Sequence, residues 1–159
     1  MKRNFFINKL IFEGIIKLIL PSDDVSNSYL VKSNNSLKAA KLLFEQDLFE
    51  ESVSMSYYSM FHITQSLFFK VGIKCENHNA LIILLKELFK QDNKDISFAK
   101  KERIDKQYYI DFEITKNSCE NMIKITENFN GDLYVFINEL SLKDIEMFRT
   151  KFKEIYLTK

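Results

Sequence analysis

Residues 48–72 read LFEESVSMSYYSMFHITQSLFFKVG, and their apolar side chains recur with the period of an α-helix. Positions three and four residues apart share one helix face, and the apolar-face positions with this spacing are Val53, Tyr57, Met60, Phe61, Thr64, Leu67 and Phe68. Gly72 follows them, and glycine commonly ends helices because it adopts positive φ without steric cost. The stretch therefore predicts a helix from about Leu48 to Lys70.

Polar residues that can cap a helix precede most of the other segments with helical spacing. Ser, Thr, Asp and Asn side chains accept hydrogen bonds from the free N–H groups of a first helical turn. The remaining predicted helices begin at Ser22 or Asp23, at Asn77 or Asn79, near Ile96, at Thr115 and at Ser141, where residues 141–144 resemble a capping box. On the helix near Ile96, we expect Phe98, Ile104 and Tyr108 to face the core. Gly131 and Asp132 are expected to break or bend the chain before Leu133.

The low glycine and proline content favours helices over strands. The 159 residues include three Gly and one Pro, whereas a β-rich fold needs turn residues roughly every 8–12 positions. Short connections make neighbouring helices antiparallel, so we predict an all-α protein, an up-and-down antiparallel bundle of about four main helices with extra terminal helices. Residues 25–130 would form the bundle, after an N-terminal amphipathic extension (1–24) and before a C-terminal helical extension (131–159) that packs on it.

Charge and cysteine content limit the possible function classes. Lys and Arg total 23 against 22 acidic residues, a net charge of +1, so any basic surface for nucleic acid must be local. Cys75 and Cys119 occur without a secretory signal, which is typical of reduced thiols in a cytoplasmic protein. The two cysteines are too far apart in the sequence to form a Cys pair with zinc-site spacing, and no Gly-rich phosphate loop is present. We therefore expect no metal site and no cofactor.

The N-terminal segment imitates the start of a signal peptide. Met1, Lys2 and Arg3 are followed by an apolar run, as at the start of a signal peptide. Charged residues interrupt this run at Lys9, Glu13 and Lys17, so we interpret the stretch as an amphipathic segment without stable membrane insertion. A role at a membrane surface remains an alternative.

Two histidines are the candidate proton-transfer groups. His78 follows Asn77 at the expected start of a helix, where free N–H groups and the helix dipole attract phosphate and disfavour a protonated imidazole. A neutral His78 could serve as a general base or hold a phosphate-bearing ligand. His62 lies mid-helix beside the apolar face. For both histidines the alternative is a structural hydrogen bond, and for His78 also a role as a helix cap.

Aromatic and cationic residues in the same segments suit contacts with RNA. Adjacent residues point about 100° apart on a helix, so Tyr58 can reach a groove while the preceding tyrosine enters the core. Lys100 and Arg103 lie in the densest basic run, and Gln107 and Tyr108 follow within two turns. Guanidinium and phenol groups together suit phosphate and base-stacking contacts. For the lysines the alternative is an ordinary solvated helix surface.

Together these segments resemble the HEPN family, particularly its compact prokaryotic, often archaeal, single-domain members. The family's second helix carries a Tyr-Tyr-Ala-Met-Phe-His-like string, matched by residues 57–62 with Ser59 in place of Ala. Residues 36–43 look like its first-helix signature, and the turn at 72–78 is similar to its glycine-containing turn that ends in Ser-His or Asn-His. Residues 103–109 resemble its later Arg-plus-Tyr element. The similarity covers residues 26–129.

The resemblance implies a helical bundle that commonly dimerises and acts on or beside RNA. Many members are implicated as metal-independent ribonucleases or RNA-binding toxins, often encoded with a minimal nucleotidyltransferase that acts as antitoxin. In active members an Arg is followed four to six residues later by His, and two copies meet to form the cleavage site. Here the corresponding residues after Arg103 are Gln107, Tyr108 and Tyr109.

Three functions are therefore open. The first is a dimeric protein that binds RNA or nucleotide and/or a minimal nucleotidyltransferase partner, as part of a toxin–antitoxin-like pair. The second is a metal-independent ribonuclease toxin, and the third is a structural or membrane-surface bundle. The predicted site comprises the candidate catalytic residues Arg103, His78 and His62 and the candidate RNA- or nucleotide-binding residues Asn77, Tyr58, Gln107, Tyr108 and Lys100.

Overall fold

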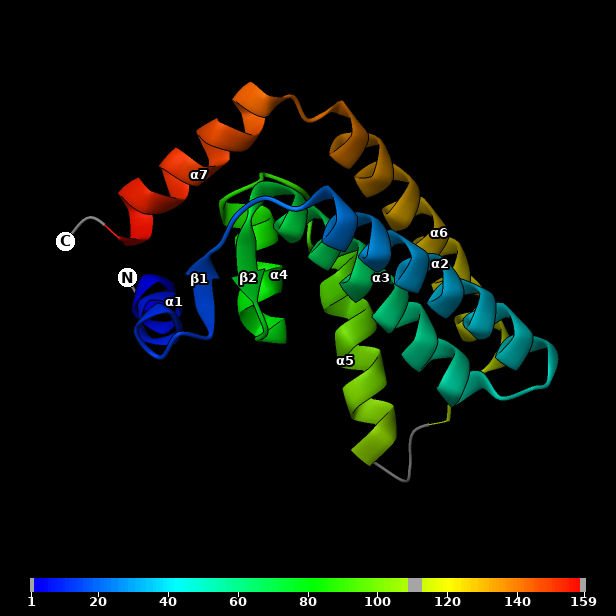
Figure 1. Cartoon of the computed structure of the whole chain (residues 1–159). Coiled ribbons are helices and arrows are strands. Elements are labelled where there is room, and N and C mark those ends of the chain that lie inside the picture. The colour runs from blue at the N-terminus through cyan, green and yellow to red at the C-terminus, as the bar shows by residue number, and fades with distance from the viewer. Residues whose placement is uncertain (1, 109–112, 158–159) are drawn as a thin grey trace.

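Long helices make up most of the structure. The computed structural model describes residues 2–108 and 113–157, with side chains described for residues 5–103 and 113–157. The helices in these ranges are α1 (Lys2–Phe12), α2 (Asp23–Glu45), α3 (Phe49–Val71), α4 (His78–Glu87), α5 (Lys94–Tyr108), α6 (Lys116–Glu139) and α7 (Leu142–Tyr156). The short strands β1 (Ile16–Leu18) and β2 (Ile73–Cys75), which were not predicted, pair antiparallel. The predicted all-α class is confirmed (Figure 1).

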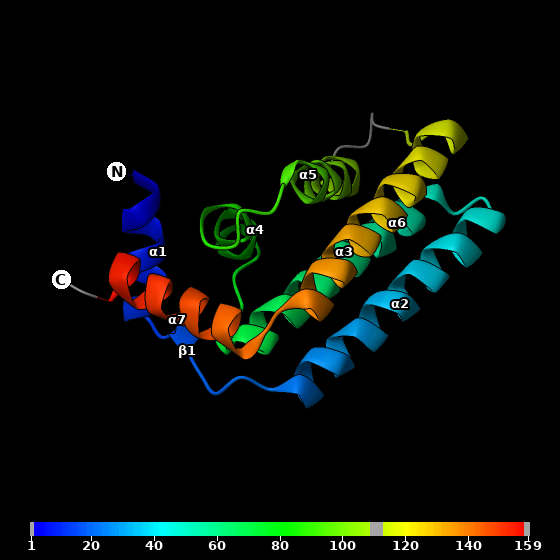
Figure 2. The ribbon, with the colours of Figure 1, turned by 90° about the horizontal axis from the view of Figure 1, so that it is seen from above.

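The helix α3 lies at the centre of the bundle. The long helices α2 and α6 run alongside it, and α5 packs on α3 and α6 (Figure 2). All seven apolar-face residues predicted for this helix are buried, with exposed fractions between 0% and 9%. Gly72 ends the helix with φ at 79°, as predicted. Among the described residues, no helix is both long and apolar enough to cross a membrane.

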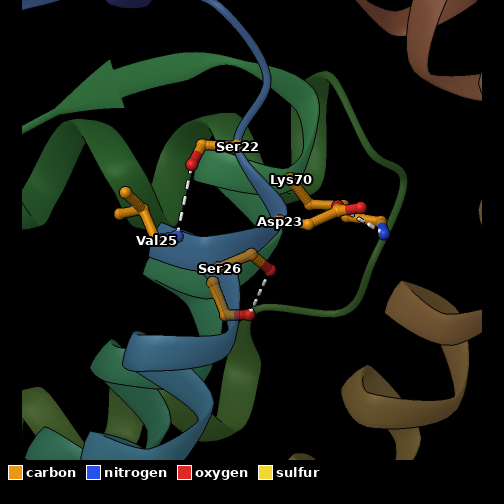
Figure 3. A network of polar contacts seen from close by, with 6 residues as sticks. Ser22, Asp23, Val25, Ser26 and Lys70 are labelled. Carbon is orange, nitrogen blue, oxygen red and sulfur yellow. Dashed lines mark hydrogen bonds and ion pairs between the residues drawn. The ribbon is translucent and has the colours of Figure 1, made fainter.

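Polar contacts hold the start of α2 against the end of α3. Ser22 caps α2 by accepting a hydrogen bond from the N–H three residues further on, at 3.2 Å (Figure 3). The Lys70 ammonium pairs with the Asp23 carboxylate at 2.7 Å, and the Ser26 and Ser66 hydroxyls lie 2.8 Å apart. The other predicted caps, on α4, α6 and α7, are also present as Asn77, Thr115 and Ser141.

Small hydroxyl side chains join α2 to α3 along their length. Ser33 and Ser59 each donate a hydrogen bond to the other's backbone carbonyl at 2.8 Å. Asn130 of α6 donates from Nδ2 to the Ser59 hydroxyl at 2.8 Å. The separation of two packed helices depends on the size of the side chains between them, so serines allow a close approach. These bonds also set which residues of α2 face α3.

An unpredicted arginine anchors α7 to the rest of the molecule. Nη1 of Arg149 donates to the carbonyl oxygens of Ile19, Val71 and Gly72 at 2.8, 2.9 and 3.0 Å. The last carbonyls of a helix have no partner within the helix itself, and a guanidinium can satisfy several at once. The contact joins α7, the end of α3 and the segment after β1.

The prediction that Gly131 breaks the chain is wrong. The helix α6 continues through this residue, which is exposed. One glycine within a helix costs only about 1 kcal/mol relative to alanine. Burial of neighbours on the inner face, such as Phe129 and Leu133, outweighs that cost. The division of the chain predicted after residue 130 therefore falls inside α6.

The prediction that Phe98 faces the core is also wrong, because its side chain is 44% exposed. The helix α5 instead buries Ile96 and Ala99. Adjacent residues on a helix point about 100° apart, so Phe98 and Ala99 lie on different faces. The Ile104 and Tyr108 side chains lie outside the described residues.

Candidate functional site

His78 begins α4 beside the middle of α3. Asn77 caps this helix, its Oδ1 accepting a hydrogen bond from the Ala80 N–H at 3.0 Å, so His78 is the first helical residue. Tyr57 and Phe61 lie one turn apart on α3 and both contact His78. The Phe61 ring stacks on the imidazole with centroids 4.0 Å apart, and the Tyr57 hydroxyl lies 2.6 Å from His78 Nδ1.

The contact with Tyr57 sets the tautomer of His78. Tyr57 is fully buried, and burial raises its pKa far above neutral, so the hydroxyl keeps its proton. Partial burial lowers the pKa of His78, and the positive charges of Arg103 and Lys100 lower it further, so the ring is neutral at physiological pH. A buried hydroxyl needs an acceptor, and a neutral imidazole offers one at its unprotonated nitrogen. We therefore assign the ring proton to Nε2, which makes that nitrogen a donor.

Arg103 of α5 lies over the paired tyrosines of α3. Its guanidinium carbon is 4.7 Å from the centroid of the Tyr58 ring and 5.5 Å from that of Tyr57. Cation–π contacts of this kind contribute about 0.5–2 kcal/mol. Tyr58 is partly exposed while Tyr57 is buried, which confirms the prediction that the two adjacent rings diverge.

Lys100 adds a second cation one turn before Arg103. Its Nζ donates a hydrogen bond to Asn79 Oδ1 at 2.6 Å. Partial burial lowers the pKa of Lys100, and the nearby charge of Arg103 lowers it further. Two neighbouring cations, one bonded to a neutral amide and the other lying on aromatic rings, make a local positive potential that attracts phosphate. We name Tyr58, His78, Lys100 and Arg103 the α3–α5 cluster.

His62 lies next to Tyr58 and faces α2. Its ring centroid is 6.1 Å from that of Tyr58 and 6.1 Å from that of Tyr29. Its Nδ1 lies 3.2 Å from the Ser36 hydroxyl oxygen. Partial burial lowers the pKa of His62, and the positive charge of Lys32 lowers it further. Tyr58 therefore connects His62 to the α3–α5 cluster.

The residues of α2 beside His62 were not predicted from the sequence. Tyr29, Lys32 and Ser36 are three and four residues apart, so they share one helix face. This spacing is visible in the sequence and could have indicated a common surface. The contact of this surface with His62 cannot be read from the sequence, because it depends on how α2 packs on α3.

The structure brings most of the predicted site residues together. The side chain of Asn77 serves as a helix cap, so its carbonyl oxygen is already engaged. The backbones of Gln107 and Tyr108 belong to α5, but their side chains lie outside the described residues, as does the whole of Tyr109. Within the described ranges, no three His, Cys, Asp or Glu residues are grouped so that they could hold a metal ion.

A pocket adjoins the α3–α5 cluster at Lys100. It has a volume of about 660 Å³ and lies between α1, α4 and α5, with Lys100 and Asn79 in its wall. Ile82, Ile83 and Phe6 give it apolar surface. Pockets of about 300–1,000 Å³ accommodate small organic ligands, so a nucleobase or sugar has room beside the cluster.

The fold is an all-α helical bundle, with its aromatic-cationic site formed by α3, α4 and α5. The family model described as HEPN domain matches residues 26–132, more than half of the chain. The chain therefore belongs to the HEPN domain family. It is also similar to UPF0332 protein glr0978 of Gloeobacter violaceus, with 34% identity over 53 residues. That match covers 33% of this chain and 42% of the relative, so the similar region is less than half of either protein.

Proposed function

We propose that the chain binds RNA through the α3–α5 cluster. The observation that carries this proposal is the position of Arg103, whose guanidinium lies 4.7 Å from the partly exposed ring of Tyr58. RNA-binding proteins stack bases on aromatic rings and guanidinium planes, and each stacked base contributes about 1–3 kcal/mol. Lys100 and the Nε2–H of His78 supply hydrogen-bond donors for phosphate oxygens beside these groups.

Binding through this cluster is expected to depend only weakly on salt. Lys100 and Arg103 can neutralise about two phosphates, which predicts a slope of about −1.4 for log affinity against log salt on a single strand. The net charge of the whole chain, +1, supports a small electrostatic contact rather than a broad basic surface. A steep slope would point to contacts elsewhere.

The geometry favours binding without cleavage. A general base needs an unprotonated nitrogen that faces the substrate. In His78 the Nδ1 lone pair accepts from Tyr57, and Nε2 carries the proton. The positions after Arg103 where active family members carry His are Gln107, Tyr108 and Tyr109 here.

We infer a homodimeric RNA-binding protein of the HEPN family with a minimal nucleotidyltransferase as partner, in a toxin–antitoxin-like pair in the cytoplasm.

Fluorescence anisotropy with a labelled RNA of about 12 nucleotides tests the binding proposal. Tyr58→Ala and Arg103→Ala should each raise Kd about tenfold, since each removes a contact of about 1–3 kcal/mol. The matched changes Tyr134→Ala and Lys143→Ala, at exposed positions of α6 and α7, should leave Kd within about twofold, because surface changes of this kind stay within about 0.5 kcal/mol. Thermal unfolding confirms that each variant is folded. An unchanged Kd in both cluster variants would refute the proposal.

The expected assembly is tested independently of RNA. Light scattering after size-exclusion chromatography measures whether the purified chain is a dimer. Co-purification from the native cell should recover a nucleotidyltransferase or RNA. A monomer that carries neither would contradict this part of the proposal.

A metal-independent ribonuclease is the second candidate. It is favoured by the lowered pKa values of His62 and His78, because a neutral imidazole could accept the proton of the attacking hydroxyl at physiological pH and then return it to the leaving oxygen. Arg103 would stabilise negative charge on the phosphorane. Cleavage of labelled RNA should then persist in EDTA and be lost in Arg103→Ala and in His78→Ala. Cleavage that continues unchanged in both variants would exclude this site as its origin.

A further inference from the structure

A second cation–aromatic pair lies on α2. The ring of Tyr29 stacks on Phe69 of α3 with centroids 5.2 Å apart and planes 11° apart. Lys32, one turn further along α2, places its Nζ 4.8 Å from the centroid of Tyr29. The arrangement is similar to that of Arg103 over Tyr58, with a lysine in place of the arginine. We name Tyr29 and Lys32 the α2 pair.

The α2 pair and the α3–α5 cluster form one continuous strip of surface. His62 lies between them, with its ring centroid 6.1 Å from that of Tyr29 and 6.1 Å from that of Tyr58. The side chains of these three residues are all partly exposed, and Lys32 is exposed. Two such ring-to-ring steps are within the span of a few nucleotides of a single strand.

Buried hydrogen bonds hold the α2 pair in place against α3. Ser26 and Ser33 flank the pair in the sequence. The Ser26 hydroxyl lies 2.8 Å from that of Ser66, and Ser33 exchanges hydrogen bonds of 2.8 Å with Ser59. A surface whose groups are already fixed binds with a smaller entropic cost than one that must be ordered on binding. The strip is therefore organised before any ligand arrives.

Positive charge is present at both ends of the strip. Burial is the largest cause of the lowered pKa values of His62 and His78. The charge of Lys32 lowers the pKa of His62 further, and the charge of Arg103 lowers that of His78 further. Both imidazoles are thus neutral groups in a positive field. A negatively charged strand with unstacked bases fits such a surface, because its phosphates meet the cations while its bases meet the rings. A duplex keeps its bases stacked and cannot use the rings.

We propose that the RNA site extends across α3 onto α2, where Lys32 holds a phosphate and Tyr29 contacts the base or sugar of a second nucleotide in the same unpaired strand. This inference rests on the proposed binding of RNA at the α3–α5 cluster. It specifies the substrate class as single-stranded RNA long enough to reach both cation–aromatic pairs. His62 lies beneath the strand between the two contacts.

Anisotropy titrations with single-stranded and duplex RNA of equal length test the extended site. The single strand should bind at least about tenfold more tightly than the duplex. Lys32→Ala should raise Kd at least about fivefold and reduce the salt slope by about 0.7, because one phosphate contact is lost. Lys38→Ala, a matched change at an exposed position on another face of α2, should alter neither quantity.

Two substitutions at Tyr29 separate contact with RNA from folding. Tyr29→Phe keeps the ring on Phe69 and should retain the wild-type Kd, whereas Tyr29→Ala should raise it at least about fivefold. If Arg103→Ala weakens binding while Lys32→Ala and Tyr29→Ala do not, RNA binds at the α3–α5 cluster alone and the extended site is refuted. If none of the three weakens binding, the proposed function fails as well. Equal affinity for duplex and single strand would also overturn the inference.

Discussion

Replacing Tyr57 by phenylalanine removes one buried hydroxyl and tests the assignment of His78. The residue is 0% exposed and its oxygen lies 2.6 Å from His78 Nδ1. Phenylalanine keeps the ring but deletes the donor. A lost intramolecular hydrogen bond costs about 0.5–1.5 kcal/mol, and an acceptor left unsatisfied raises the cost to about 1–3 kcal/mol. Because His78 is partly exposed and water can reach it, we expect a loss of about 1–2 kcal/mol in the free energy of unfolding.

Two measurements check this prediction. Thermal unfolding should show a Tm lower by about 2–8 °C, the change expected for that free energy in a chain of this size. The matched control Tyr134→Phe, on a ring that is 52% exposed, should change the free energy of unfolding by less than about 0.5 kcal/mol. Long-range ¹H–¹⁵N correlation spectra should place the proton of His78 on Nε2 in the wild type, and Tyr57→Phe should raise the population of the form protonated on Nδ1.

Either of two results would refute the reasoning. One is a wild-type His78 that carries its proton on Nδ1, and the other is a Tyr57→Phe variant as stable as the wild type. Both would mean that the hydroxyl does not donate to the imidazole. Nε2 would then be free to accept a proton, and this result would favour the ribonuclease function over RNA binding without cleavage.

The remaining predictions concern stability. Gly72→Ala should lower the free energy of unfolding by about 2–4 kcal/mol, because a Cβ at φ 79° would lie 2.6 and 2.7 Å from two backbone atoms. Urea denaturation measures this change, and a Gly72→Ala variant as stable as the wild type would contradict the prediction. Gly131→Ala, in open space on α6, is the matched control and should stabilise the chain by about 0.5–1 kcal/mol. Stability should fall as pH drops below 6.5, since the lowered pKa values of His62 and His78 let the unfolded chain bind protons that the folded chain does not. The double variant His62→Gln/His78→Gln should lose this part of the pH slope in thermal unfolding, and an unchanged slope would exclude the histidines as its cause. Arg149→Ala should lower the free energy of unfolding, measured by urea denaturation, by about 2–3 kcal/mol. An Arg149→Lys variant as stable as the wild type would show that the three carbonyls do not need a guanidinium.

The helix boundaries could be read from the sequence because capping is local. Ser22, Asn77, Thr115 and Ser141 each accept a hydrogen bond from the first turn of their own helix. Gly72 ends α3 through its own φ angle. None of these interactions needs a distant partner, so a few consecutive residues contain the information. Gly131 was misread because glycine only weakens a helix, and burial of the same helix face decides the outcome.

The centre of the candidate site was also accessible from the sequence. The divergence of Tyr57 and Tyr58 follows from helix geometry alone, and the position of His78 follows from the cap at Asn77. Arg103 was recognised by residue type and by its place in the family pattern. Its position over Tyr58 is a tertiary contact, which the sequence could suggest but not locate.

The sequence by itself determined which segments are helical, where most of them begin, and which side chains carry charge or an aromatic ring. Only the tertiary structure decided that Tyr29 and Lys32 lie beside His62, that Arg149 closes the end of α3, and that β1 pairs with β2. These contacts depend on how each helix is rotated and shifted along its neighbour. Rotation and shift are set by the packing of many residues far apart in the chain, and no short pattern contains them.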